Sequence, residues 1–394
     1  MVPENSTFFS FSESNTTFTP YIRSSVVAIS AKEDELKIEQ IDVNFSAENI
    51  DDGREKDYYS IPDGNFSLFG LNYSEKEGGF YRVPGDIAEK TNAGVEALAR
   101  NTSGGRLCFS TNSEYLSITV AYEYLCKFAH MSLTGTSGFS LFEKTDYGYD
   151  FVASLHPGLD DEKGFFADCA LPGGKMHDYV LFFPLYNDVD SLVVALEKGS
   201  FVESFNPYKA VFPVVYYGSS ITQGACASRP DNCYQAFASK WTNVDFLNFG
   251  FSGSAKGEEV MAEYLSSIPA SLFVMDYDHN APDTEWLKRT HYNFYKKYRE
   301  NNVATPILFI SRPDYKHTPD GEERLRIIKS TYKRAKKEGD EKVWLLSGEK
   351  LYGAIDYENC SVDGCHPNDL GFYRIAKKVL KKIKEICPDY FALK

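Results

Sequence analysis

The sequence predicts an all-β sandwich of the jelly-roll type over residues 1–205, followed by an α/β domain with a parallel sheet over residues 206–394. Two observations lead to this fold class. Up to about residue 205, short alternating apolar runs are separated by clusters of Gly, Asn, Asp and Ser, as in antiparallel sandwiches. From residue 206 onward, apolar strand-like runs alternate with longer helical patterns, which indicates a parallel sheet with helices on both faces.

Within the β-rich part, residues 36–41 and 116–120 alternate between apolar and other side chains, and residues 179–186 are more continuously apolar. Turn signals such as D-G-N at 63–65 separate these runs. The pattern is typical of short antiparallel strands joined by tight turns. Residues 87–100 are expected to hold one short helix.

In the second part, strands and helices are expected to alternate. The last helix is the most clearly marked, because Pro367 suits its first turn and Phe372, Ala376, Val379 and Ile383 form one apolar stripe, with lysines facing water. The expected strands are 211–217, 244–249, 271–276, 306–311 and 343–346. The expected helices are 232–241, 256–267, 283–301, 320–338 and 367–386.

Composition and charge narrow the class of protein. A chain of 394 residues, 43% of them hydrophobic and 15% aromatic, is long enough to bury two cores or one large one. Its net charge of −14 argues against a nucleic-acid partner, because such binding depends on Lys and Arg neutralising phosphates. No apolar run approaches the roughly 18 residues of a membrane span, so no membrane partner is expected.

The compartment predicted from the sequence is the cytoplasm. The first residues, MVPENSTFFSFSESNTTF, lack the basic leader and the apolar core of a secretory signal. The eight cysteines are scattered along the chain without paired spacing. Together these features predict reduced thiols in a cytoplasmic protein.

A serine pair follows the first strand of the α/β part. The run V-F-P-V-V-Y-Y ends at Gly218, and Ser219 and Ser220 come next. A residue just past a buried parallel strand lies at the carboxyl edge of the sheet, where ligands usually bind. By itself the tripeptide is a weak signal, because Gly-Ser-Ser is common in loops.

An Asp and a His stand three residues apart just before the last helix, in D-G-C-H from Asp363 to His366. Across a tight turn, made easier by Gly364, the carboxylate can hold the imidazole Nδ1–H while Nε2 faces a hydroxyl. Taken alone, the segment is better interpreted as a helix cap with an incidental His.

Two further segments follow the second and third strands. N-F-G-F-S-G ends at Gly253, whose backbone N–H is unhindered, and D-Y-D-H-N ends at Asn280, whose amide can donate hydrogen bonds. All four motifs fall at carboxyl ends of strands in one sheet, so their groups can converge. A hydroxyl, an Asp/His pair and two donors are the set that acyl transfer needs.

These ordered blocks resemble the SGNH (GDSL-type) hydrolase superfamily of esterases and lipases, over roughly residues 210–386. The resemblance implies a flavodoxin-like, three-layer fold that needs no cofactor or metal. It implies Ser220 as nucleophile, with Asp363 and His366 completing the triad. It also implies an oxyanion hole made by the Ser220 backbone N–H, Gly253 and Asn280.

The β-rich part, with G-R-L-C-F-S-T-N-S near 105–113 and G-F-S-L-F at 138–142, resembles the amino-terminal sandwich of a bacterial two-domain branch of that superfamily. The branch is similar in layout to sugar acetylesterases.

The α/β part departs from the family pattern at two positions. The Asp that precedes the nucleophile in the family is Ser219 here, which leaves open which hydroxyl attacks, and the usual Gly-x-Asn-Asp block is D-H-N-A at 278–281. No G-x-S-x-G occurs, which disfavours the α/β-hydrolase fold.

Other polar residues have two interpretations each. Arg229 and Arg312 could contact a polar substrate or form structural salt bridges, while His279 and His291 are expected to be structural. The cysteines at 360 and 365 beside His366 do not show the paired spacing of a zinc site, so no metal is expected.

The sequence therefore predicts a metal-independent serine esterase that acts through an acyl-enzyme, most simply by deacetylating carbohydrates. The partner would be a small-molecule or oligosaccharide ester, and an oligomer is possible. Short polar loops at 229–232 and 314–320 predict a short acyl group. Two alternatives remain open: a general acylesterase, lipase or thioesterase of the same superfamily, and a non-catalytic carbohydrate-binding protein.

Overall fold

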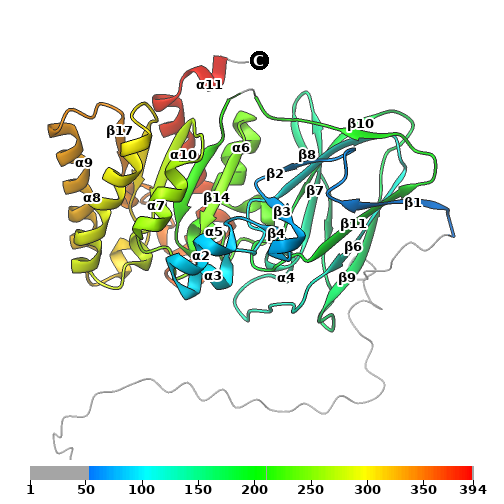
Figure 1. Ribbon diagram of the computed structural model, residues 1–394, viewed down its shortest axis with the longest axis horizontal. Coiled ribbons are helices and arrows are strands. Elements are labelled where there is room, and N and C mark those ends of the chain that lie inside the picture. The colour runs from blue at the N-terminus through cyan, green and yellow to red at the C-terminus, as the bar shows by residue number, and fades with distance from the viewer. Residues whose placement is uncertain (1–52, 210, 393–394) are drawn as a thin grey trace, which may run out of the picture. The chain divides into compact units, whose positions relative to one another are not determined.

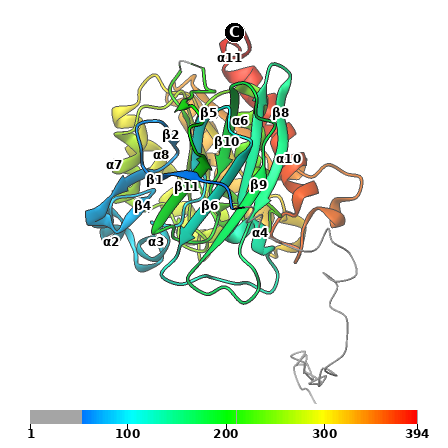
Figure 2. The same cartoon turned by 90° about the vertical axis from the view of Figure 1, so that its right-hand side faces the viewer.

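Two antiparallel sheets precede the α/β part of the chain. The structure is a computed structural model that describes residues 53–209 and 211–392, all within a single unit of tertiary contacts. One sheet has the strand order β1-β11-β6-β9, and the other has the order β12-β5-β10-β7-β8 with β2 pairing β5. Figure 2 shows β1, β11, β6 and β9 running side by side. The expected strand at 36–41 lies outside the described residues, and the domain boundary at residue 205 stays a prediction.

The core of this sandwich comes from alternate residues of facing strands. Leu107 and Phe109 from one sheet, and Leu116 and Ile118 from the other, are fully buried in one cluster. Because side chains alternate across a strand, the predicted period of two places these residues inside. The strands are β1 (Lys56–Ile61), β2 (Ser67–Phe69), β3 (Asn72–Ser74), β4 (Gly79–Tyr81), β5 (Arg106–Thr111), β6 (Tyr115–Ala121), β7 (Phe139–Thr145), β8 (Gly148–Leu155), β9 (Gly164–Ala170), β10 (His177–Phe182), β11 (Ser191–Glu197) and β12 (Val202–Ser204).

The helix expected over 87–100 is in fact two short helices, α2 (Gly85–Thr91) and α3 (Ala93–Leu98). The break falls at Asn92, whose backbone is extended and whose side chain accepts hydrogen bonds from the N–H groups of Gly94 and Val95. Asparagine favours such capping over a helix interior, because its side chain competes for backbone donors. A third short helix, α4 (Leu133–Thr136), lies between β6 and β7.

The α/β part is built on a five-stranded parallel sheet with the order β14-β13-β15-β16-β17. Gly218 at the end of β13 pairs with Gly250 of β14 and with Asp276 of β15, so the carboxyl ends of these three strands are level. The strands are β13 (Val214–Gly218), β14 (Phe246–Gly250), β15 (Leu272–Asp276), β16 (Ile307–Ile310) and β17 (Val343–Leu346). The predicted fold class, an antiparallel sandwich followed by a parallel α/β domain, is confirmed.

Helices cover both faces of the parallel sheet (Figure 1). Val214 and Tyr216 of β13 share a buried cluster with α6 and α10, while Val215 and Tyr217 share another with α7, α8 and α9. The helices are α5 (Ser220–Gln223), α6 (Tyr234–Thr242), α7 (Glu259–Ser266), α8 (Thr284–Asn301), α9 (Gly321–Lys337), α10 (Asp369–Ile386) and α11 (Asp389–Ala392). The 3₁₀ turns are η2 (Glu75–Glu77), η3 (Pro230–Asn232), η4 (Asp278–Asn280), η5 (Tyr315–His317), η6 (Gly348–Lys350) and η7 (Tyr357–Cys360). No helix among the described residues is long and apolar enough to cross a membrane.

Helix α10 begins two residues later than expected. Asn368 caps it by accepting a hydrogen bond from the N–H of Gly371, so Pro367 lies before the helix and not in its first turn. The side-chain oxygen of asparagine satisfies an N–H of the first turn that has no partner within the helix, which favours a helix start just after Asn368. The predicted apolar stripe is buried as expected.

Strand β14 is an edge of the parallel sheet, and two buried arginines cover it. Its carbonyls at 246, 248 and 250 point away from β13, because the carbonyl of Asp245 faces β13 and accepts from Val214 and carbonyls alternate along a strand. Arg82 donates to the carbonyls of Asn248 (3.1 Å) and Gly250 (2.6 Å), and Arg106 donates to that of Phe246 (3.0 Å). Both arginines belong to the β-rich part, so it satisfies an edge that would otherwise be open.

Replacing Arg82 by Met is expected to lower the free energy of unfolding by about 3 kcal/mol, since three carbonyls (Asn248, Gly250 and Leu98) would lose a buried donor. Urea unfolding followed by circular dichroism measures this. The exposed Arg326→Met, which breaks only a surface pair with Glu323, is expected to cost under about 0.5 kcal/mol. Equal losses in the two variants would contradict the importance of the β14 contacts.

Candidate active site

The turn after β13 presents two serines in different ways. A Cβ on Gly218 would lie 2.4 Å from the Asp276 carbonyl and 2.1 Å from Thr222 Oγ1, so only glycine fits where α5 packs against the strand ends. Ser219 is the N-cap of α5, and its fully buried hydroxyl accepts a hydrogen bond from the N–H of Ile221 (3.2 Å). Ser220, the next residue, is left to face the other side of the turn.

Ser220 meets the predicted Asp/His pair. Its Oγ lies 2.9 Å from His366 Nε2, and His366 Nδ1 lies 2.8 Å from Asp363 Oδ2. The structure therefore brings together the three residues expected to form a triad, across 146 positions of sequence. Ser219, with its hydroxyl engaged in capping, is not in this chain of hydrogen bonds.

The loop from Asp363 to His366 fixes the carboxylate and the imidazole with respect to each other. Gly364 adopts a left-handed conformation (φ 84°), which glycine tolerates without strain. Asp363 Oδ1 accepts hydrogen bonds from the backbone N–H groups of Cys365 (3.0 Å) and His366 (2.7 Å). The loop closes with a hydrogen bond from the N–H of Val362 to the His366 carbonyl (2.9 Å).

The Asp363 carboxyl is held in its ionised form. Burial by itself would raise its pKa, but hydrogen bonds from the His366 side chain and from the backbone of His366 and Cys365 lower that pKa to about 2. A carboxylate only accepts hydrogen bonds, so His366 Nδ1 must carry the proton that faces it. The Nε2 lone pair of a neutral ring then points at the Ser220 hydroxyl, as a general base requires.

Three donors were predicted for an oxyanion hole. As the first residue of α5, Ser220 has an N–H without an intrahelical acceptor, and Gly253 has φ 65° in the turn after β14 with open space where a Cβ would stand. Asn280 Nδ2 donates one hydrogen to the Phe251 carbonyl (2.8 Å), and the N–H of Phe251 donates to the Gly218 carbonyl (2.9 Å). The second amide hydrogen of Asn280 remains for another acceptor. The oxyanion role of these donors stays a prediction.

The β-rich part adds residues that no sequence signal indicated. The ring centroid of His130 lies 6.2 Å from that of His366, and Phe128 packs 5.7 Å from Tyr186. The Tyr186 hydroxyl in turn donates to the Ser220 carbonyl (3.5 Å). His130 and Phe128 are exposed, so they form a rim beside the triad. Their segment, C-K-F-A-H-M, carries no motif spacing that could have identified it.

Arg229, proposed from sequence as a substrate contact, is engaged by another residue. Its guanidinium donates to the buried Asp231 carboxylate (3.1 and 3.4 Å) and lies over the Phe151 ring (4.4 Å). Its contact with substrate stays a prediction.

His291 is buried on α8 against Thr331 Oγ1 (2.9 Å), and burial lowers its pKa to about 3. It is therefore neutral, and it lies in a structural setting, as expected.

One cluster within the described residues has the composition of a metal site: His279, Asp314 and Cys365, whose ligand atoms lie within 4.8 Å of one another. Its chemistry does not suit a cation. Arg312 holds both oxygens of Asp314 (2.8 and 2.7 Å) and brings a positive charge. Burial, followed by the nearby Asp314, raises the pKa of the Cys365 thiol to about 12.

Two protein families match successive parts of the chain. Residues 212–384 match the GDSL-like Lipase/Acylhydrolase family. Residues 57–202 match the family described as the N-terminus of SGNH-hydrolase-type esterases (GxDLY). No curated protein matches the sequence.

Solved structures are similar over most of the chain. A protein described as a GDSL-like lipase from Bacteroides ovatus ATCC 8483 is 26% identical, with a TM-score of 0.77 over 85% of this chain and 98% of that one. A salicylyl-acyltransferase from a tetracycline biosynthetic pathway is 20% identical, with a TM-score of 0.70 over 84% and 98%. A family two carbohydrate esterase from Clostridium thermocellum, solved with cellohexaose, is 13% identical, with a TM-score of 0.57 over 81% and 98%. The last two likenesses concern the fold alone.

Proposed function

We propose that this chain, which belongs to the SGNH/GDSL-like hydrolases and carries their GxDLY-type N-terminal domain, is a serine esterase that removes short acyl groups, chiefly acetyl, from carbohydrates. The observation that carries the esterase proposal is the continuous path from Ser220 Oγ through His366 to Asp363. Similarity to structures described as carbohydrate esterases supports the substrate class at the level of fold.

The reaction follows from the geometry in two half-reactions. Ser220 Oγ attacks the ester carbonyl carbon while His366 Nε2 takes the hydroxyl proton, forming a tetrahedral oxyanion. The C–O bond to the sugar then breaks, and His366 returns the proton to the leaving alkoxide, which leaves an acyl-enzyme. Water attacks this ester with His366 again as base, and collapse releases the acid and restores the Ser220 hydroxyl.

The negative charge grows on the carbonyl oxygen, so donors must be in place before the reaction starts. The Ser220 N–H, the Gly253 N–H and the second hydrogen of Asn280 are the groups proposed to meet it. The ionised Asp363 stabilises the imidazolium that forms when His366 takes the serine proton. The exposed rim formed by His130 and Phe128 is suited to contact the alcohol part of the substrate.

Activity on p-nitrophenyl esters is expected to fall steeply beyond about four acyl carbons. A long apolar pocket would instead raise kcat/KM about fourfold per added methylene, from about 0.8 kcal/mol per buried CH₂. The measurement is kcat/KM from acetate to decanoate, together with acetate released from acetylated xylan or glucomannan. A maximum at octanoate or longer, with no acetate released from the glycans, would replace the acetylesterase proposal with the lipid alternative.

A further inference from the structure

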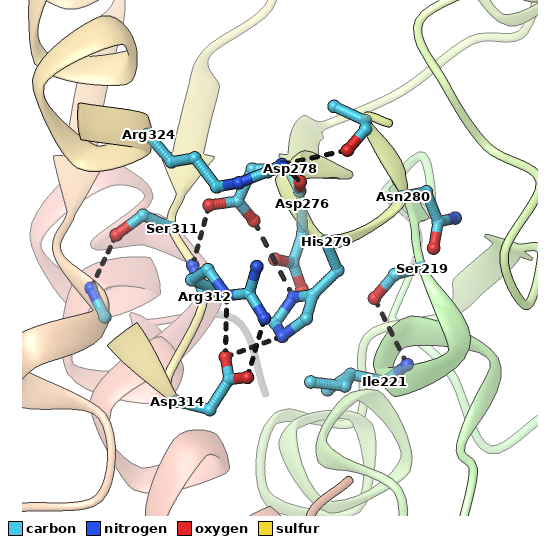
Figure 3. A network of polar contacts seen from close by, with 12 residues as sticks. Ser219, Ile221, Asp276, Asp278, His279, Asn280, Ser311, Arg312, Asp314 and Arg324 are labelled. Carbon is cyan, nitrogen blue, oxygen red and sulfur yellow. Dashed lines mark hydrogen bonds and ion pairs between the residues drawn. The ribbon is translucent and has the colours of Figure 1, made fainter. Parts of the chain in front are cut away.

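A buried group of charged residues lies where β15 and β16 end, next to the active site (Figure 3). His279 Nε2–H donates to Asp314 Oδ1 (2.7 Å), and Arg312 holds the same carboxylate through two hydrogen bonds (2.8 and 2.7 Å). The side chains of His279, Asp314 and Arg312 are only 5%, 3% and 11% exposed. Burial would raise the pKa of Asp314, but the hydrogen bonds and charges of Arg312 and His279 hold it well below its usual range.

The same residues join the two strand ends. The backbone N–H of Arg312 donates to Asp278 Oδ2 (3.1 Å), and Arg324 of α9 donates to the carbonyls of Asp278 (2.5 Å) and Ala281 (3.0 Å). The short η4 turn that carries Asp278, His279 and Asn280 is therefore fixed from both sides. The segment after β16 and helix α9 therefore support this turn, in addition to its own backbone hydrogen bond from the Asn280 N–H to the Tyr277 carbonyl (3.0 Å).

This group contacts both halves of the candidate site. His279 directly precedes Asn280, the predicted oxyanion donor, and Asn280 reaches the Phe251 carbonyl at 2.8 Å. On the other side, Cys365 Sγ lies within 4.8 Å of the ligand atoms of His279 and Asp314, and the N–H of Cys365 donates to Asp363 Oδ1 (3.0 Å). The charged group thus lies between the η4 turn and the loop from Asp363 to His366.

A buried charged group of this kind is poor at stabilising a fold. The desolvation of buried ions usually offsets their attraction, and apolar residues of similar volume are often as stable or more so. Here the arrangement also leaves Asp278 Oδ1 and His279 Nδ1 without hydrogen-bond partners, and the contact between them is a 3.7 Å ion pair only. The group does, however, fix the orientation of its side chains, because two parallel hydrogen bonds hold a guanidinium and a carboxylate in one relative geometry.

We propose that Arg312, Asp314 and His279 form a positioning unit that holds Asn280 at the oxyanion and keeps it in register with the Asp363–His366 loop. The inference rests on the proposed esterase function of this site. Arg312 fixes Asp314, Asp314 fixes the ring of His279, and the ring fixes the η4 turn from which the Asn280 amide projects. None of the three touches the reacting atoms, so they act through Asn280.

A double-mutant cycle between His279 and Asn280 tests this. Asn280→Ala is expected to lower kcat by about 10²–10³-fold, the usual loss for one oxyanion donor. His279→Ala is expected to lower kcat by about 10–100-fold with KM changed by less than about threefold, since small misplacements of catalytic groups act on turnover. The double variant is expected to resemble Asn280→Ala and to fall well short of the product of the two losses.

The kcat values are expressed per active site, by titration with a fluorophosphonate, so that a lower folded fraction does not count as a lower rate. His279→Gln offers an amide hydrogen to Asp314 and is expected to recover most of the lost kcat. His177→Ala is the matched control, because it removes another histidine that bonds to a carboxylate, Glu143 (2.7 Å), in the β-rich part. It is expected to lower stability and leave kcat per site unchanged.

Three outcomes would overturn the proposal: an unchanged kcat per site in His279→Ala, losses that multiply in the double variant, or stoichiometric bound metal whose removal by a chelator abolishes activity. If His279→Ala does not fold, Asp314→Asn replaces it in the cycle with the same expectations. Failure of the esterase proposal is distinguishable, because it would appear in the unsubstituted protein as no hydrolysis and no fluorophosphonate labelling.

Discussion

Ser220→Ala is expected to lower kcat on p-nitrophenyl acetate by about 10⁶-fold, the loss seen when a triad nucleophile is removed. The reason is geometric. Ser220 Oγ is the hydroxyl at 2.9 Å from His366 Nε2, so no other serine can pass its proton to the imidazole without moving the turn. Any residual rate, about 10³–10⁴ over water, would come from binding and the oxyanion donors.

The neighbouring Ser219→Ala is the control for that experiment. Ser219 caps α5 through its hydroxyl, so its loss is expected to cost about 1 kcal/mol of stability and leave kcat within a few fold. A fluorophosphonate, followed by mass spectrometry of the labelled peptide, is expected to mark Ser220. Labelling of Ser219, or full activity in Ser220→Ala, would show that the assignment is wrong.

Asp363→Asn is expected to lower kcat by about 10⁴-fold with little change in fold. The asparagine amide can present a donor to His366 Nδ1, which favours the tautomer that has no lone pair facing Ser220. It also removes the charge that stabilises the imidazolium. The matched control is Asp356→Asn in the same segment, an exposed residue with left-handed backbone (φ 54°), where asparagine is well tolerated. Steady-state kinetics on both variants gives the comparison, and equal activities would remove Asp363 from the mechanism.

The pH dependence separates the carboxylate from the imidazole. Since the pKa of Asp363 is depressed to about 2, its ionised form is present at all higher pH and is lost only as the pH falls toward that value. The rise of kcat/KM with pH in the neutral range is therefore expected from a histidine losing its proton. The measurement is the profile of kcat/KM against pH. A second, acidic titration above about pH 3 would contradict the depressed pKa of Asp363.

Much of the fold was predictable because its signals are local. The alternating and helical periods of the second part predicted five strands and five helices whose positions the structure reproduces within a few residues. Two of the misplaced details, the break at Asn92 and the start of α10 at Asp369, come from asparagine caps, while β13 and α7 each begin three residues later than expected. A cap depends on one side-chain hydrogen bond, and the spacing of apolar residues does not predict where that bond forms.

In the candidate active site, too, the local relationships were predictable from the sequence and the long-range ones were not. Gly218 with Ser220, and Asp363 with His366, are each within four residues of each other, so turn geometry alone makes their relationship predictable from sequence. The edge contacts of Arg82 and Arg106, the approach of His130 to His366, and the hydrogen bond between His279 and the Asp314 carboxylate that Arg312 holds were not predictable. Each joins segments far apart in the chain, and which buried polar group finds which partner depends on how whole elements pack. The periodicity of a sequence predicts which side chains of one helix or strand are buried. Which residue of another element each polar side chain bonds to is decided only by the tertiary packing.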